Sequence, residues 1–327
     1  MWEILGQPRA VTLLERSISR GELSHAYLFV GPPYVGKMTL ALNLAQAVNC
    51  QAENAPCGEC ASCIRISSAK HADIQVISLI SAEKKEIGID QIREMQTSAS
   101  LPPYEGKQKV YIIDRADLLS QEAGNSLLKT LEEPLPGVLI ILLTSRERLL
   151  LPTIKSRCQR LDLPPVPFTL IEEVLKQQYG VSEQKADLLA RLSGGCPGWA
   201  LLALQNEKLL EERSQRIDTL ISLTNAGRRK RFTYAAELAA RFGKAREEVE
   251  AVLALWLNWW RDLLLLKGGK GEFITNVDQE QALLRQAEGY SMSQTRDFIY
   301  HLQAVGRQLE QNANPRLALE VLMLNMP

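Results

Sequence analysis

A glycine-rich run near the start of the chain predicts a phosphate site. Residues 31–37 read Gly-Pro-Pro-Tyr-Val-Gly-Lys, a G-x-x-x-x-G-K pattern that follows an apolar run and opens a helix-like stretch. In this pattern the glycines let backbone N–H groups close around phosphate oxygens, and the lysine reaches the outer phosphates. We therefore expect Gly31, Gly36 and Lys37 to belong to a P-loop. A simple Gly/Pro turn between a strand and a helix is the alternative.

The residue after the P-loop lysine argues against ordinary magnesium chemistry. Ser or Thr is expected there, because its hydroxyl ligates Mg²⁺, but the chain has Met38. A thioether is a poor ligand for a hard cation. Thr39 is the nearest hydroxyl, yet one step along a helix turns the side chain by about 100°. The sequence leaves ATP binding open, with Thr39 as a candidate contact, and predicts impaired handling of Mg²⁺.

An apolar run that ends in an acid predicts the second nucleotide motif. Residues 110–113 read Val-Tyr-Ile-Ile and precede Asp114, which is how a Walker B carboxylate is presented to Mg²⁺. An active ATPase of this kind carries Glu next, whereas this chain has Arg115. A guanidinium stays protonated and cannot act as a general base. Asp117 is the only nearby substitute, and a strand-capping role for Asp114 is the alternative.

Four cysteines within fourteen residues predict a metal centre. Cys50, Cys57, Cys60 and Cys63 have the spacing C-x₆-C-x₂-C-x₂-C, and four thiolates this close can surround a tetrahedral Zn²⁺. All four ligand positions are then filled, so the zinc is structural. Disulfides and an iron–sulfur cluster are the alternatives. His71 follows nearby and is predicted to be a loop or strand-entry residue rather than a ligand.

The elements around these motifs predict an α/β domain. Short apolar runs alternate with helical patterns over the first ~165 residues, as in a parallel sheet covered by helices. The predicted strands are Ala26–Val30, Ile74–Ser78, Lys109–Ile113, Val138–Thr144 and Gln159–Leu161, and the predicted helices span 37–49, 89–97 and 120–133. The run Leu163–Pro167 contains three prolines and is predicted to be a linker.

The remainder of the chain is predicted to be helical. Thr169 and Glu172 fit a capping box that would start a small helical unit, and no convincing strand follows. The predicted domains are 1–164, with the cysteine module 50–63 inserted, then 165–206 and 207–327. A tryptophan stripe at 256, 259 and 260 lies on one helix face and is predicted to be core or subunit interface. The basic run 228–231 is predicted to be a solvated face.

Composition excludes several classes of protein. The chain has 327 residues, 46% of them hydrophobic, so it can bury a large core without disulfides. Its 38 basic and 38 acidic residues balance, which argues against a protein that coats nucleic acid or anionic membranes. No apolar stretch approaches the ~20 residues that cross a bilayer, and the first seven residues lack the apolar core of a secretory leader. We expect a cytoplasmic protein with no membrane partner.

Several motifs, taken in order, resemble one protein family. The chain is similar to clamp-loader subunits of the AAA+ superfamily, and most of all to the delta prime family of bacterial DNA polymerase III. The Leu-Leu-Lys-x-Leu-Glu-Glu-Pro and Ser-Arg-Cys motifs are typical of clamp loaders within that superfamily. The residues that carry the resemblance are Leu5–Gln7, His25–Phe29, the P-loop, Leu127–Pro134 and Ser156-Arg157-Cys158. The resemblance implies an AAA+ domain, a small helical lid domain and a helical collar domain, and a zinc module after the P-loop helix.

The resemblance also implies roles for two residues outside the P-loop. Arg157 would be an arginine finger that reaches across a subunit boundary to the γ-phosphate held by a neighbour. A planar, permanently charged guanidinium suits this role. Thr144 matches the family's sensor position at the end of a strand. The alternatives are a surface arginine and a threonine at a sheet end with no ligand.

A third group of the family's ATPase site is also missing. The resemblance places a second sensor arginine in the small helical domain, where this chain has Gly198 and Trp199. Together with Met38 and Arg115, this favours a subunit that does not hydrolyse ATP itself, although it would be part of a DNA polymerase holoenzyme.

The resemblance implies a function within a larger assembly. The chain would be a rigid stator in a hetero-pentamer with gamma/tau and delta subunits, which opens a sliding clamp and places it on primed DNA. A second hypothesis is an ATP-hydrolysing motor subunit like gamma or tau. A third is a zinc protein that binds nucleic acid alone, but the segment from Cys50 to Cys63 contains no Lys or Arg.

Overall fold

The computed structural model describes residues 2–81, 84–311 and 313–327. Contacts between residues divide the chain into two compact units. The first comprises Met1–Val174 with Gly195–Trp199, and the second comprises Leu175–Gly194 with Ala200–Pro327. Each unit is described by itself. The finer boundaries at 164/165 and 206/207 stay predictions.

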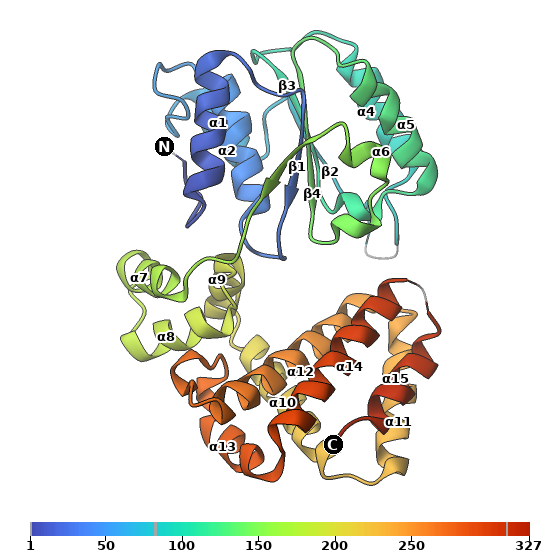
Figure 1. The fold of residues 1–327 in the computed structure, drawn as a ribbon. Coiled ribbons are helices and arrows are strands. Elements are labelled where there is room, and N and C mark those ends of the chain that lie inside the picture. The colour runs from blue at the N-terminus through green and yellow to red at the C-terminus, as the bar shows by residue number, and fades with distance from the viewer. Residues whose placement is uncertain (1, 82–83, 312) are drawn as a thin grey trace. The chain divides into compact units, whose positions relative to one another are not determined.

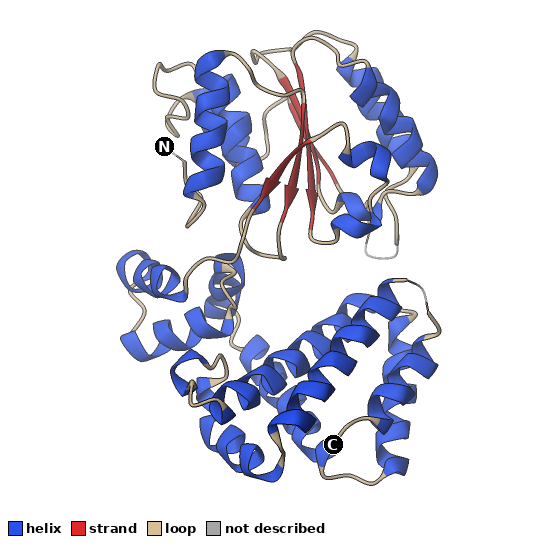
Figure 2. Cartoon of the chain, in the orientation of Figure 1, coloured by secondary structure: helices blue, strands red, loops and turns tan. Residues whose placement is uncertain are grey.

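The first unit is built on a five-stranded parallel sheet (Figure 2). The strand order is β2-β3-β4-β1-β5, so the chain crosses over between strands and returns in the same direction each time. The bounds are β1 Ala26–Val30, β2 Ile74–Ile77, β3 Lys109–Ile113, β4 Val138–Thr144 and β5 Gln159–Asp162. This confirms the predicted α/β fold with a parallel sheet.

Helices cover both faces of this sheet (Figure 1). On one face lie α1 Pro8–Arg20 and α2 Lys37–Asn49, and on the other lie α4 Ile89–Ala99 and α5 Gln121–Glu132. Strand residues alternate between the two cores, because successive side chains of a strand point to opposite faces. In β4, Ile141 packs with α1 and α2, whereas Leu142 packs with α4 and α5. The carboxyl ends of β1, β3 and β4 therefore meet at one edge, where the P-loop begins.

Short elements complete the first unit, and all of them lie beside candidate functional residues. The α-helices are α3 Ala61–Ser67, within the cysteine module, and α6 Pro152–Lys155, just before Arg157. The 3₁₀ turns are η1 Ala116–Leu118 and η2 Glu147–Leu149. None of these four was among the predicted elements.

The second half of the chain is helical, as predicted, but one predicted cap is wrong. The helix α7 Phe168–Tyr179 begins before Thr169, because the carbonyl of Pro167 already accepts the N–H groups of Leu170 and Ile171. Thr169 therefore lies inside the first turn and does not cap the helix. The remaining helices are α8 Glu183–Leu192, α9 Pro197–Gln205, α10 Lys208–Thr224, α11 Arg228–Phe242, α12 Arg246–Lys267, η3 Gly271–Phe273, η4 Val277–Gln279, α13 Glu280–Gly289, α14 Met292–Glu310 and α15 Pro315–Leu324.

The tryptophan stripe forms the centre of the second unit. Trp256, Trp259 and Trp260 on α12 are fully buried. The centroid of the Trp260 ring lies 4.7 Å from that of Phe298 on α14 and 5.1 Å from that of Tyr290, which follows α13. Aromatic side chains from separate segments therefore pack together there. The core interpretation of the stripe is confirmed.

The basic run at the start of α11 is solvated except for its last member. Arg228, Arg229 and Lys230 are exposed as predicted. Arg231 is partly buried, and its guanidinium donates to the carbonyl oxygens of Leu223, Thr224, Met326 and Pro327. It satisfies carbonyls at the end of α10 and at the chain terminus, so the prediction of a solvated face is wrong at this position. Within the described residues, every helix is too short or too polar to cross a membrane.

Candidate functional site

The P-loop has the backbone geometry that phosphate binding requires. It runs from the end of β1 into α2, and the N–H of Gly31 donates to the carbonyl of Thr144 at 3.2 Å. A Cβ at Gly31 would lie 2.4 Å from the carbonyl oxygen of Leu163, so only glycine fits. Gly36 has φ +107°, a conformation that side chains disfavour, and is the N-cap of α2. The free N–H groups at the start of α2 therefore face the loop and can bind an anion.

Lys37 lies within this loop. Its Nζ donates to the carbonyls of Gly31 at 2.7 Å and Pro32 at 2.8 Å. Burial lowers the pKa of Lys37, against the opposing effect of Asp114, Cys196 and Asp117 nearby. The structure thus brings the P-loop lysine together with the acidic residues that follow β3.

The side chain after the lysine belongs to the core. Met38 packs against the apolar cluster formed by α1, α2 and the sheet. Thr39 follows it in the first turn of α2 and is partly buried. The thioether is an apolar packing group at this position, in keeping with its poor affinity for Mg²⁺.

Asp117, which the sequence offers as a substitute for the missing base, is held by other side chains. The Asp117 carboxylate accepts from Thr144 Oγ1 at 2.8 Å and from Arg146 Nε at 2.9 Å and Nη2 at 2.8 Å. The side chain of Asp117 is 2% exposed and that of Arg146 is 15% exposed. The Thr144 hydroxyl also accepts the N–H of Arg146 at 2.9 Å. Asp117 is therefore the centre of a buried ion pair that links the ends of β3 and β4.

This network was not predicted from the sequence. The sequence predicts a sensor position at Thr144, or else a threonine at a sheet end with no ligand, and it gives no local indication of the pairing with Arg146. The available signal was the topology, since polar residues that follow neighbouring parallel strands lie at one edge of the sheet. Asp114 ends β3 as predicted, with its N–H donating to Ile77 at 2.9 Å. Arg115 follows with φ +56° and turns the chain into η1.

The start of α9 lies against the P-loop within the first unit. The N–H of Gly198 donates to the carbonyl of Tyr34 at 2.9 Å, and a Cβ at Gly198 would lie only 3.0 Å from that oxygen. The backbone here approaches the loop closely because the residue is glycine. The segment expected to carry a second sensor arginine therefore contacts the loop through its backbone.

Arg157 is presented at the surface of the first unit. It follows α6, and its Nη2 lies 2.7 Å from Glu132 Oε1 at the end of α5. Its Nη1 donates to the Thr153 carbonyl at 3.1 Å and to Ser156 Oγ at 3.2 Å. The side chains of Arg157 and Glu132 are 35% and 50% exposed. In the described part of the chain these contacts do not include the P-loop.

The four cysteines of the inserted module form one cluster. Their Sγ atoms all lie within 4.8 Å of one another, and those of Cys57 and Cys63 are 3.9 Å apart. Tetrahedral Zn–S bonds of about 2.3 Å place sulfurs about 3.8 Å apart, so the spacing fits a metal. All four are free thiols, which removes the disulfide alternative.

The local fold shifts the pKa values of two of these thiols in opposite directions. Cys60 is the N-cap of α3, and the backbone N–H of Gln51, with other hydrogen bonds, lowers its pKa to about 6. Burial raises the pKa of Cys63 to about 12. A bound cation favours the thiolate of every ligand, and binding would therefore release protons.

Polar side chains hold the backbone around the cluster, and of these Gln46 and His71 are buried whereas Lys107 is exposed. Gln46 Nε2 donates to the Cys63 carbonyl at 3.0 Å, and Lys107 Nζ donates to the Cys50 carbonyl at 2.6 Å. His71 is buried beside Ser62, 3.2 Å from its hydroxyl, and leads into β2. It is a strand-entry residue outside the thiol cluster, as predicted.

Comparisons with known proteins match subunits of DNA polymerase III along most of the chain. Residues 6–167 match the family described as "DNA polymerase III, delta subunit", and residues 207–326 match "DNA polymerase III, delta subunit, C terminal". The DNA polymerase III subunit delta' of Bacillus subtilis is 33% identical over 320 residues, which cover 97% of this chain and 95% of that protein. The DNA polymerase III subunit tau of the same organism is 27% identical, over 99% of this chain and 61% of that protein. A gamma subunit-related protein of Thermotoga maritima aligns in structure over 96% of this chain and 98% of its own, with a TM-score of 0.45 and 22% identity.

Proposed function

This chain belongs to the delta prime family of DNA polymerase III subunits, and from this membership we propose that it is the non-hydrolysing stator of a clamp loader. The observation that carries the proposal is the engagement of Asp117. Its carboxylate accepts hydrogen bonds from Thr144 and Arg146, so the acid that the sequence offers in place of the missing base is already engaged by other side chains. Arg115 cannot take a proton in its place.

The residues of the P-loop site support nucleotide binding better than hydrolysis. The P-loop backbone, Lys37 and Asp114 remain, and an ATP phosphate could lie at the start of α2. When bound, Mg²⁺ would neutralise the phosphates, with Asp114 as its available carboxylate. Met38 withholds the hydroxyl ligand, and Thr39 is a candidate contact only. We propose that any nucleotide held here is retained rather than hydrolysed.

In the proposed assembly, Arg157 completes a neighbour's ATP site. It stands at the surface in the Ser-Arg-Cys motif, and Glu132 holds it through an exposed ion pair. Stabilising the charge on a transferring γ-phosphate is the use of such an arginine. The neighbour would be a gamma or tau subunit, and a delta subunit would complete the hetero-pentamer that opens the sliding clamp on primed DNA.

The other parts of the chain receive structural roles in this proposal. Residues 165–206 would be the lid domain, and residues 207–327, built around the buried tryptophans of α12, would be the collar that holds the ring. The four cysteines would bind one structural Zn²⁺, with each thiolate as a ligand.

ATP hydrolysis by the purified chain tests the stator proposal. We expect no Mg²⁺-dependent turnover above that of a chain carrying Lys37→Ala, because both lack a base and a complete metal site. Turnover that Lys37→Ala abolishes would instead identify a motor subunit like gamma or tau.

Metal analysis tests the proposed centre independently. We expect one zinc per chain, reduced to none by Cys60→Ser, with Cys158→Ser as a matched control outside the cluster. Iron in place of zinc, or no metal in freshly purified protein, would overturn the zinc assignment.

A further inference from the structure

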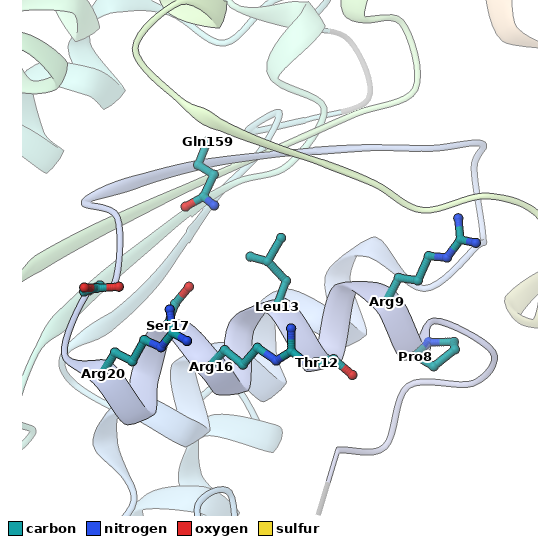
Figure 3. A pocket seen from close by; sticks show the side chains of 9 residues that line it. Pro8, Arg9, Thr12, Leu13, Arg16, Ser17, Arg20 and Gln159 are labelled. Atoms are coloured by element: carbon teal, nitrogen blue, oxygen red, sulfur yellow. The ribbon is translucent and has the colours of Figure 1, made fainter.

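A groove on the first unit is separate from every site described above. It lies between α1 and the edge strand β5, and has a volume of about 570 Å³ (Figure 3). The residues that shape it include Arg9, Thr12, Leu13, Arg16, Arg20 and Gln159. Its floor is partly apolar at Leu13, and its wall on the α1 side carries three arginines.

The arginines form one charged stripe. Arg9, Arg16 and Arg20 are separated by seven and four residues, which places them on the same side of a helix. All three are exposed, and in the described part of the chain none has an acidic group within ion-pair distance. Glu22 is the only acid that lines the groove. Three unneutralised guanidiniums against one carboxylate make the groove basic in a chain whose overall net charge is zero.

The other wall is the open edge of the sheet. β5 is the edge strand of the sheet. Just beyond its end, the N–H of Leu163 still points toward β1 and donates to the carbonyl of Val30 at 2.8 Å. Backbone groups alternate in direction along a strand, so the N–H and C=O groups of Arg160 and Asp162 point to the free edge. Gln159 points from this edge toward α1 in Figure 3.

We propose that this groove binds an extended acidic segment of a partner protein, which adds as a strand to the edge of β5. Its backbone would bond with Arg160 and Asp162, and alternate carboxylates would face the stripe on α1. Arg9 to Arg20 span about 16 Å along the helix axis. A strand covers that length in about five residues.

The two faces of the sheet at β5 favour a segment in which acidic and uncharged residues alternate. On the far face of β5, Arg160 pairs with Asp162 at 2.5 Å and with Glu147 at 2.9 Å, so its charge is already compensated. Uncharged side chains fit there, and acidic ones fit toward α1. Single-stranded nucleic acid is a poorer match, because such sites stack bases on aromatic side chains and the lining of this groove has none.

Fluorescence anisotropy with the full-length chain tests the proposal. The probe is a fluorescein-labelled peptide of four glutamates alternating with three valines. We expect binding that weakens about tenfold or more in the Arg9→Gln/Arg16→Gln/Arg20→Gln variant, because three charge-assisted contacts are lost. Glutamine keeps helix propensity, so the variant should fold, and unchanged circular dichroism and Tm would verify it. The matched control changes three exposed arginines elsewhere, Arg93, Arg229 and Arg285, to glutamine.

Two further probes separate strand addition from simple charge attraction. N-methylation of alternate backbone amides should abolish binding, because it removes the hydrogen bonds to the edge of β5. A lysine-for-glutamate peptide should not bind. Equal binding to both arginine variants, retained binding of the N-methylated peptide, or tighter stripe-dependent binding of a twelve-nucleotide oligo-dT would each overturn the proposal.

Discussion

The residues around the P-loop and the surface around Arg157 belong to the same unit, but their charges are paired in opposite ways. In the pocket, Lys37 donates to carbonyls of its own loop, and Asp117 is bound to Arg146 with both side chains largely buried. At the surface, Arg157 bonds with Thr153, Ser156 and the half-exposed Glu132. The charged groups near the P-loop are paired within the protein interior, whereas the Arg157–Glu132 ion pair is exposed to solvent.

The energies of these two arrangements explain why the difference matters. Separating a buried ion pair leaves an uncompensated charge and costs several kcal/mol, whereas an exposed pair contributes only about 0–1 kcal/mol. Arg157 can therefore exchange Glu132 for another anion at small cost, and Asp117 cannot leave Arg146. In the proposed function, the first unit would thus lack its own ATPase chemistry and still keep a residue that serves a neighbour.

The largest expected effect is that of Arg157→Ala in the assembled loader. ATP turnover at the site that Arg157 completes should fall by about 10³-fold, because an arginine finger supplies that much of the rate. The measurement is steady-state hydrolysis by the loader reconstituted with gamma or tau and delta subunits.

Assembly and a neighbouring arginine control this experiment. The variant should co-elute with its partners on size exclusion, because Arg157 takes part in an exposed ion pair and in hydrogen bonds within its own turn, whose loss should leave the fold intact. Arg148→Ala, on η2, should leave turnover unchanged. If Arg157→Ala also leaves ATP turnover unchanged, the surface around Arg157 has no catalytic role. The proposed contrast between this surface and the P-loop residues would then be wrong.

Asp117→Asn should have the next largest effect, on stability rather than turnover. The amide would point N–H groups at Arg146, so we expect a loss of about 2–3 kcal/mol in the free energy of unfolding. Urea denaturation measures it. Asp162→Asn is the exposed control and should cost less than about 1 kcal/mol. A large fall in loader ATPase without loss of stability would show that Asp117 is catalytic after all.

The elements around both sites could largely be predicted from the sequence, because long apolar runs are bounded by charged or turn residues. β1, β3 and β4 have the predicted bounds. The P-loop glycines were identifiable since their spacing reflects a backbone requirement. α3 and α6 were not predicted, because helices of seven and four residues are too short to show a 3.6-residue period.

The side-chain pairings could not be predicted in the same way. Asp117 and Arg146 are 29 residues apart, and their pairing depends on β3 and β4 being adjacent in the sheet. Arg231 looked like part of a solvated run, because nothing local indicates that the chain terminus folds back over it. Spacing along the chain predicts elements, whereas charges are paired by tertiary structure.

Glu132→Gln should have a small effect on loader ATP turnover, and it tests whether Glu132 positions Arg157. Glutamine keeps an acceptor but loses the charge that positions the guanidinium, so we expect loader turnover to fall by about threefold. Glu133→Gln, the exposed neighbour, is the matched control and should have no effect. Increased turnover would mean that Glu132 restrains Arg157 instead of positioning it.

The smallest expected effect is that of Lys37→Ala on the assembled loader, where we expect no change in ATP turnover. In most P-loop proteins this lysine is essential because it reaches the outer phosphates. Here its contacts are with Gly31 and Pro32, and the base and the hydroxyl ligand that would use a bound nucleotide are absent. Under the proposed function, hydrolysis in the loader would depend on the neighbours' lysines and on Arg157 of this chain. A loss of ATP turnover as large as that of Arg157→Ala would show that the P-loop of this chain also hydrolyses ATP. The distinction between the P-loop residues and the Arg157 surface would then no longer hold.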